Sequence, residues 1–117
     1  MSNVTFINLT GKIVRILNGV DRITVIREIP RTLSGPLEVS ETAQRKMVFG
    51  RIPVLRPAEK RITNLPHAEL EKGYYFVVPR ALKAFVPPAR VDVLCPGVDS
   101  CFLEDDTVIT CSFLEGV

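Results

Sequence analysis

Residues 73–97 of this chain, GYYFVVPRALKAFVPPARVDVLCPG, combine two strand patterns with one helix pattern. Residues 74–78 form a continuous aromatic and β-branched run, which is typical of a strand covered on both faces. Pro79 ends that strand because it has no amide hydrogen, and residues 80–85 have the residue types and spacing of a short helix. Residues 91–95 then alternate as a second strand. The connection of about a dozen residues permits a parallel crossover or an antiparallel return.

Alternating segments elsewhere predict further short strands. The strongest turn signal is Asn18-Gly19, because both residues accept positive φ, and it predicts a hairpin with a type I′ turn. Gly50 lies inside an apolar run and indicates a bulge or a tight hairpin. The other predicted strands lie at residues 4–8, 13–17, 22–29, 37–44, 46–54, 101–103 and 108–113.

These elements predict a single β-rich α+β domain over residues 1–117. We expect about eight or nine short, mostly antiparallel strands and one short helix, arranged as a sandwich or a partly open barrel. No apolar run approaches the length of a membrane span, and the first residues lack a signal-peptide pattern. The odd set of three cysteines fits reduced thiols. We therefore expect a cytoplasmic protein with no membrane partner.

Charge is unevenly distributed along the chain. Residues 1–61 carry eleven Lys and Arg against five Asp and Glu, whereas residues 62–117 carry four against eight. This asymmetry is compatible with a basic ligand face. It is equally compatible with basic and acidic strands side by side, or with two subunits that meet head to tail, and we favour these structural interpretations.

Catalytic and metal-binding motifs are largely missing. His67 is the only histidine, and a zinc site would need it together with Cys95, Cys101 and Cys111, whose spacing is not that of a zinc knuckle. The acidic run Glu104-Asp105-Asp106 is typical of a solvated turn. We predict no catalytic residue, no metal and no cofactor.

Basic residues are concentrated in residues 45–61, which carry six of them with the single acid Glu59. Phosphate groups bind to such segments. Only Phe49 provides an aromatic ring there, so a platform for stacked bases is poorly supported. The segment disfavours polymeric nucleic acid and is compatible with a small phosphorylated ligand.

A second set of polar residues lies at predicted strand ends. Arg80 stands where a strand gives way to a helix, a place where backbone amides bind anions. Arg90 and Asp92 point to the same side of an extended chain, so they form either an internal ion pair or part of a site. The candidate ligand-binding residues are Asn8, Thr10, Tyr74, Arg80, Arg90 and Asp92.

Several short motifs occur in the order of a known family. They are INLT at residues 7–10, GRIP at 50–53, LP at 65–66, GYYFVV at 73–78, RVDVLCPG at 90–97, and the strand at 108–113. Together they resemble a family of short uncharacterised proteins of bacteriophages and bacteria with the pattern INLTPH, GLP, YIVS, RDDxxxPG and GCRSF. This chain departs from the pattern at Gly11-Lys12, Pro79 and Ser112. The resemblance implies a phage accessory, counter-defence or structural role, in the host cytoplasm if the chain is phage-encoded.

Two classes of function follow from the residues and the resemblance. The first is a non-catalytic protein that binds a nucleotide or another anionic metabolite, with Arg80 and Arg90 on the anion, Tyr74 as a face, and Asn8 and Thr10 as orienting groups. The alternative is a small structural or assembly module that forms homo-oligomers through its sheet edges. An enzyme that uses Asp92 with a metal is the weakest hypothesis.

Overall fold

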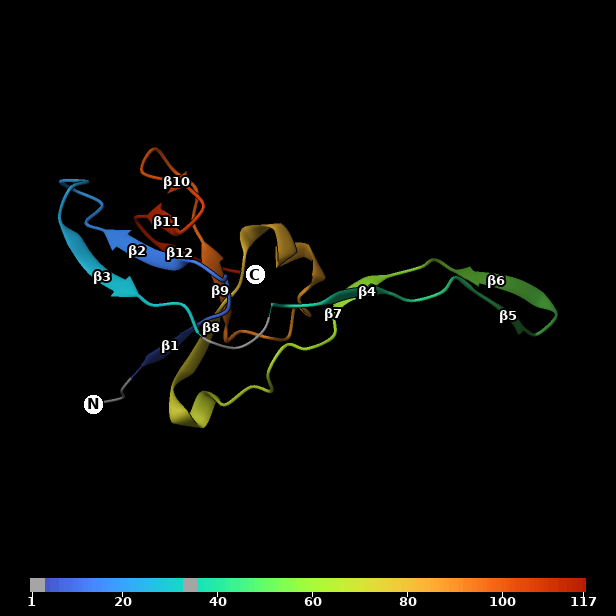
Figure 1. Cartoon of the computed structure of the whole chain (residues 1–117). Coiled ribbons are helices and arrows are strands. Elements are labelled where there is room, and N and C mark those ends of the chain that lie inside the picture. Colours follow the sequence, from blue (N-terminus) through green and yellow to red (C-terminus); the bar gives the residue numbers. More distant parts are fainter. Residues whose placement is uncertain (1–3, 33–35) are drawn as a thin grey trace.

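The computed structural model describes residues 4–32 and 36–117. They form a body of two four-stranded sheets, from which a narrow β-ribbon extends (Figure 1). The molecule measures 63 × 32 × 27 Å, and its radius of gyration is 17.6 Å. A compact domain of this length would have a radius of gyration of about 13 Å. The ribbon accounts for the difference.

The first sheet joins strands from both ends of the chain. Its order is β1 (Thr5–Asn8), β8 (Tyr74–Val77), β9 (Val93–Pro96) and β12 (Leu114–Gly116). β1 and β9 both run parallel to β8, while β12 is antiparallel to β9. The link between β8 and β9 is therefore the parallel crossover. It contains the 3₁₀ helix η2 (Arg80–Phe85) where the sequence predicts a short helix.

The second sheet has the order β10 (Leu103–Glu104), β11 (Val108–Cys111), β2 (Ile13–Leu17) and β3 (Val25–Ile29). β11 runs parallel to β2, and the outer strands β10 and β3 are each antiparallel to their neighbour. No further described strand pairs with either outer strand, so each leaves an edge of the sheet open.

Two apolar clusters cover the two faces of the first sheet. One joins it to the second sheet through Val14, Ile29, Val77, Ile109 and Cys111. The other lies on the opposite face, where Val78, Val86, Val93 and Cys95 pack with Leu37, Ile62 and Leu65. The successive residues Val77 and Val78 thus enter different clusters, as expected for a strand covered on both faces.

The ribbon, here called the arm, comprises residues 38–63. β4 (Val39–Glu41) pairs with β7 (Lys60–Ile62) next to the body, and β5 (Arg45–Phe49) pairs with β6 (Ile52–Arg56) at the far end. Gly50 and Arg51 join β5 to β6, and both have positive φ, 53° and 68°. This is the conformation of a type I′ turn, so the tight hairpin predicted at Gly50 is confirmed.

The β-rich class is confirmed, but the described residues form more strands than predicted, twelve in four sheets. Within residues 4–32 and 36–117, helix is confined to η2 and the 3₁₀ turn η1 (Leu70–Lys72). Most strand pairs are antiparallel, although the two four-stranded sheets are mixed. Within the described residues no helix has the length and apolar character needed to cross a bilayer.

The hairpin predicted at Asn18-Gly19 is present and joins β2 to β3, but the prediction of a type I′ turn is wrong. The loop is longer, and the positive φ of 60° falls on Arg22. The Asp21 carboxylate accepts hydrogen bonds from the Ile23 and Thr24 amides, at 2.9 Å each, and the Asn18 amide donates to the Thr24 carbonyl. These local bonds satisfy a wider loop than the two-residue turn.

Candidate functional site

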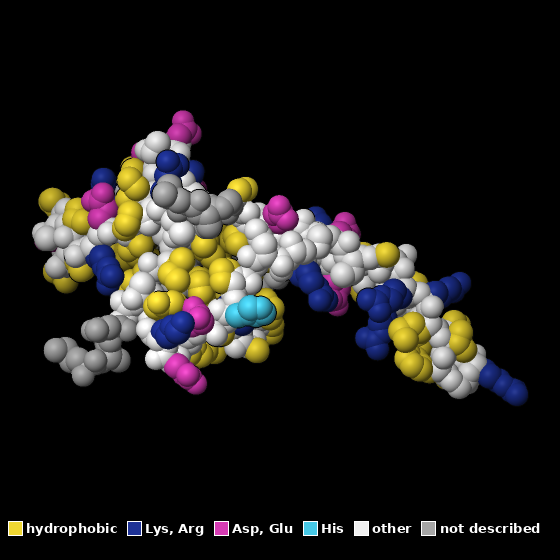
Figure 2. All heavy atoms as spheres, turned by 60° about the horizontal axis from the view of Figure 1, so that its bottom comes forward, with side chains coloured by type: hydrophobic (Ala, Val, Ile, Leu, Met, Phe, Trp, Pro, Cys, Tyr) yellow, Lys and Arg dark blue, Asp and Glu magenta, His cyan; other side chains and the backbone are white. Residues whose placement is uncertain are grey.

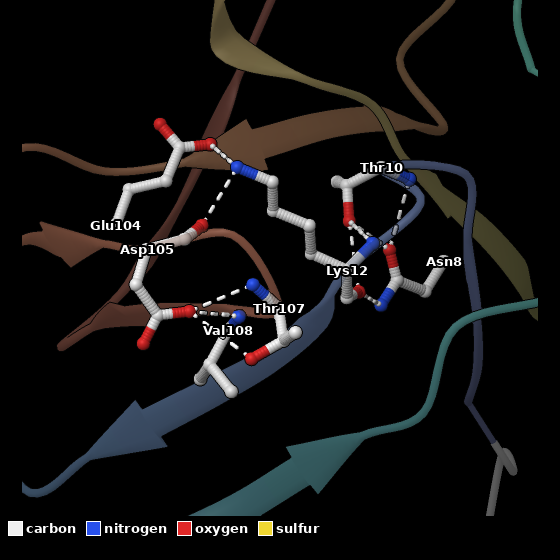
Figure 3. A network of polar contacts seen from close by, with 7 residues as sticks. All are labelled: Asn8, Thr10, Lys12, Glu104, Asp105, Thr107 and Val108. Carbon is white, nitrogen blue, oxygen red and sulfur yellow. Dashed lines mark hydrogen bonds and ion pairs between the residues drawn. The ribbon is translucent and has the colours of Figure 1, made fainter.

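Asn8 lies at the end of β1 and is 1% exposed. Its Nδ2 donates to the carbonyls of Lys12, at 2.6 Å, and Ile29, at 3.0 Å. Its Oδ1 accepts from the Thr10 amide, at 3.0 Å, and from the Thr10 hydroxyl, at 2.6 Å (Figure 3). Both amide hydrogens and the oxygen are thus occupied inside the protein. Asn8 and Thr10 hold β1, the following loop and β3 together.

Lys12 extends this network to the turn between β10 and β11 (Figure 3). Its Nζ donates to the Asp105 carbonyl, at 2.8 Å, and lies 3.2 Å from Glu104 Oε1. The Asp105 carboxylate accepts from the Thr107 and Val108 amides, at 2.7 Å each, and these bonds lower the pKa of Asp105. The acidic turn (Glu104, Asp105 and Asp106) is therefore an ordered, exposed structure.

Arg90 and Asp92 form a two-point ion pair just before β9. Arg90 Nε donates to Asp92 Oδ1 at 2.9 Å, and the second pair of atoms, Nη2 and Oδ2, lies 3.0 Å apart. Asp92 is 1% exposed, and the Arg90 guanidinium lies 6.0 Å from the centre of the Phe76 ring. The bond from Arg90 lowers the pKa of Asp92 against the opposing effect of burial. The ion pair considered from the sequence is present.

Arg80 opens η2 and shares Glu115 of β12 with Lys83. Its Nη1 donates to Glu115 Oε2 at 2.7 Å and to the Pro96 carbonyl at 3.3 Å, while Lys83 Nζ donates to Glu115 Oε1 at 2.8 Å. Lys83 and then Arg80 lower the pKa of Glu115 to about 2. Both cations are already bound to a carboxylate.

The six predicted ligand-binding residues lie at two opposite ends of the strands of the first sheet. Tyr74 pairs with Thr5 at the amino ends of β8 and β1, and its ring centre lies 5.8 Å from Lys72 Nζ. Arg90 and Asp92 precede β9 at this same end of the sheet. At the opposite end, Asn8 is the last residue of β1, Thr10 follows β1, and Arg80 follows β8. Three surface hollows of the described chain are lined by none of the six.

The cysteines are distributed over different parts of the body. Cys95 and Cys111 are buried in separate apolar clusters, and all three thiols are free. Burial raises the pKa of the Cys95 and Cys111 thiols, which keeps them protonated. Among residues 4–32 and 36–117, no three His, Cys, Asp or Glu side chains are grouped as metal ligands.

The arm contains a group of arginines that was not predicted from the sequence to form a site. A hollow of about 350 Å³ at the junction of its two ribbon segments is lined by Arg45, Arg56 and Arg61, with Thr42, Met47 and Glu59 beside them. We call it the arginine hollow. Arg45 lies directly opposite Arg56 in the ladder, an arrangement that like charge destabilises. The signal available in the sequence was the basic run at residues 45–61.

The end of the arm, residues 45–56, exposes apolar side chains on both faces. Opposite residues of the ladder share a face, so Met47, Phe49, Ile52 and Val54 lie with the Arg45–Arg56 pair, and Val48, Pro53 and Leu55 lie on the reverse. Phe49 is 50% exposed, Ile52 65%, Val48 69% and Leu55 59%. In Figure 2, hydrophobic atoms are exposed at the end of the arm, beside Lys and Arg side chains.

A second, wider hollow of about 860 Å³ lies where the arm meets the body. It is lined by residues 59–62 of the arm and by residues 84–88 at the end of η2. Glu59, Lys60 and Arg61 all line it, and Glu59 lies 3.3 Å from Arg61, so the hollow carries charges of both signs.

Comparisons with protein-family models, with curated proteins and with solved structures found no match. The resemblance to the phage and bacterial family stays a prediction.

Proposed function

We propose that this protein is a small assembly module that binds further copies of itself through the arm. The observation that carries the proposal is the apolar surface on both faces of a two-stranded ribbon. Such a ribbon is a single layer with no second layer of its own to cover either face, and an isolated hairpin is marginally stable in water. Clustered apolar side chains exposed at one place indicate an interaction surface.

Burial of the exposed apolar side chains of the arm contributes free energy to association. Complete burial of a large apolar side chain contributes about 1.5 to 3 kcal/mol, and Phe49, Ile52, Val48 and Leu55 each retain half or more of their exposure. Half of that gain at Phe49 and Ile52, which share a face, amounts to about 1.5 to 3 kcal/mol, and Val48 and Leu55 add a similar amount where the partner also covers the reverse face. The total has to exceed the entropy lost on association.

The strand edges of the arm differ in what they offer a partner. β5 pairs only with β6 among the described strands, so its outer edge is open. Pro53 deprives β6 of one amide hydrogen and hinders pairing along that side. The four basic side chains at residues 45–56, with no acid among them, disfavour contact between two arms. The partner surface therefore belongs to the body of the other copy.

Binding of a small anion through Arg80 and Arg90 has less support. Both guanidinium groups already bond carboxylates of the same chain, Arg80 with Glu115 and Arg90 with Asp92. An anion would have to displace these carboxylates. The two arginines also lie at opposite ends of the strands of the first sheet, so they do not face one site.

Sedimentation velocity over a range of protein concentrations tests the proposal. We expect the unaltered protein to self-associate and the double variant Phe49→Ser, Ile52→Ser to remain monomeric. The matched control is Val20→Ser with Val91→Ser, which removes apolar groups that are 94% and 69% exposed on the body. A protein that stays monomeric throughout would refute the assembly function. A nucleotide released in stoichiometric amount on heating would favour the ligand-binding function instead.

A further inference from the structure

The arginine hollow holds positive charge that the described side chains only partly neutralise. Arg61 lies 3.3 Å from Glu59, whereas Arg45 and Arg56 form no ion pair with any described residue. Guanidinium groups bind carboxylates through two parallel hydrogen bonds. The hollow is thus suited to carboxylates from outside the chain.

The acidic turn has the complementary character at the other end of the molecule. Asp106 is exposed and makes no ion pair within the described residues. The bonds from Thr107 and Val108 to Asp105 hold the turn in one shape, so little conformational freedom is lost on binding. Residues 98–106 contain four acids and no base.

Apolar groups accompany the charges on both surfaces. Leu103 precedes the acidic turn on the open edge strand β10 and is 69% exposed. On the arm, Met47, Phe49 and Ile52 share their face with Arg45 and Arg56. Each surface thus carries apolar and charged groups side by side, with charges of opposite sign.

We infer that the acidic turn of one copy binds in the arginine hollow of the next, with Leu103 against the apolar end of the neighbouring arm. This inference rests on the proposed assembly function and names the partner surface. The arm and β10 extend from different sides of the body (Figure 1). The contact therefore joins two different surfaces. Repeated from copy to copy it generates a closed ring or an open filament, and where two copies bind each other's arm reciprocally it closes a two-fold dimer.

Charge exchange tests this contact directly. Asp106→Lys and Arg56→Glu are each expected to weaken self-association about tenfold or more, since each places like charges together. A mixture of the two variants is expected to assemble again, because every contact between unlike chains restores opposite charges. Glu71→Lys, an exposed charge change elsewhere on the body, is the matched control. Urea denaturation checks that each variant remains folded.

A second mixture tests the head-to-tail geometry. The double variant Phe49→Ser, Ile52→Ser keeps the acidic turn, and Asp106→Lys keeps the arm. Together they are expected to form a one-to-one complex with one functional contact. Species larger than two chains in this mixture would overturn the inferred geometry.

The outcomes separate this inference from the proposed function. Failure of the unaltered protein to associate refutes both. Association that depends on Phe49 and Ile52 but responds equally to Asp106→Lys and Glu71→Lys refutes only the inferred contact. Millimolar inorganic phosphate supplies a further test. If phosphate binds the protein without dissociating the oligomer, and Arg56→Glu abolishes phosphate binding, the hollow is a phosphate site and the inference is again overturned.

Discussion

Replacing Arg90 with methionine is expected to leave the Asp92 carboxylate buried without its counter-ion. Methionine keeps most of the length of the side chain but removes both hydrogen bonds to Asp92. The remaining carboxylate has 1% exposure, so water solvates it poorly. The free energy of unfolding should fall at neutral pH.

The magnitude follows from the position of the pair. Removing one partner of a buried ion pair costs about 3 to 5 kcal/mol. The Arg90 side chain is 19% exposed, so water can approach the vacated space, and the lower end of about 3 kcal/mol applies. With a denaturant slope of about 1.5 kcal/mol per molar urea, the unfolding midpoint should fall by roughly 2 M.

Measurements at two pH values identify the cause. In the unaltered protein Arg90 lowers the pKa of Asp92, so its stabilising effect is present above the unfolded value of about 3.9 and is lost as the pH falls through the folded value. In Arg90→Met, burial without the cation should raise the pKa, so the penalty grows as the pH rises above about 4. Urea denaturation at about pH 7 and pH 3 should therefore show a large and a small difference, respectively.

The double variant Arg90→Met, Asp92→Asn supplies the control. It lacks the buried charge, so it should be more stable at neutral pH than Arg90→Met alone. A loss below about 1 kcal/mol for Arg90→Met would show that the pair contributes little and would reopen Arg90 as a ligand-binding residue. The same loss at both pH values would show that it arises from packing and not from the buried charge.

Three further predictions concern other polar and close-packed positions. Glu115→Gln should lower the urea midpoint at neutral pH, and its difference from the unaltered protein should shrink as the pH falls from 4.5 towards 2, because the pKa of Glu115 is lowered to about 2; an unchanged difference would contradict this. Asn8→Ala should reduce the free energy of unfolding by about 3 kcal/mol, measured with urea, since it leaves several buried polar groups unpaired. Gly97→Ala should lower the melting temperature by roughly 5 °C, because the added methyl group overlaps the Phe113 ring, and Phe113→Leu in the same chain should restore part of the loss.

Local patterns in the sequence were sufficient for most of the strands. The apolar run at residues 74–78 and the alternation near residue 93 correspond to β8 and β9. The turn at Asn18-Gly19 was mistaken because the Asp21 side chain, three residues further on, determines the loop. The parallel pairing of β2 with β11 is absent from any local pattern, since it joins segments far apart in the chain.

The candidate site shows the same division. Arg90 and Asp92 could be predicted as neighbours because only Val91 separates them, although the structure places the pair in the turn before β9 and not in an extended chain. The Arg80–Glu115 pair could not, because it depends on the pairing of β9 with β12. The exposure of Val48 and Phe49 could not be predicted either, because an apolar run predicts a strand without showing whether a second layer covers it.

The order in which the strands are synthesised has a consequence for the nascent chain. Thr5 pairs with Tyr74 and Ile13 with Val108, so neither N-terminal strand can complete its sheet until late in translation. The β5–β6 hairpin needs only neighbouring residues and closes in microseconds. Non-local pairing should make the body fold in milliseconds to seconds, and submillisecond refolding in a stopped-flow experiment would contradict this. The acidic turn is synthesised after the arm, so under the proposed assembly function a growing chain displays its arm well before it can accept the arm of another copy.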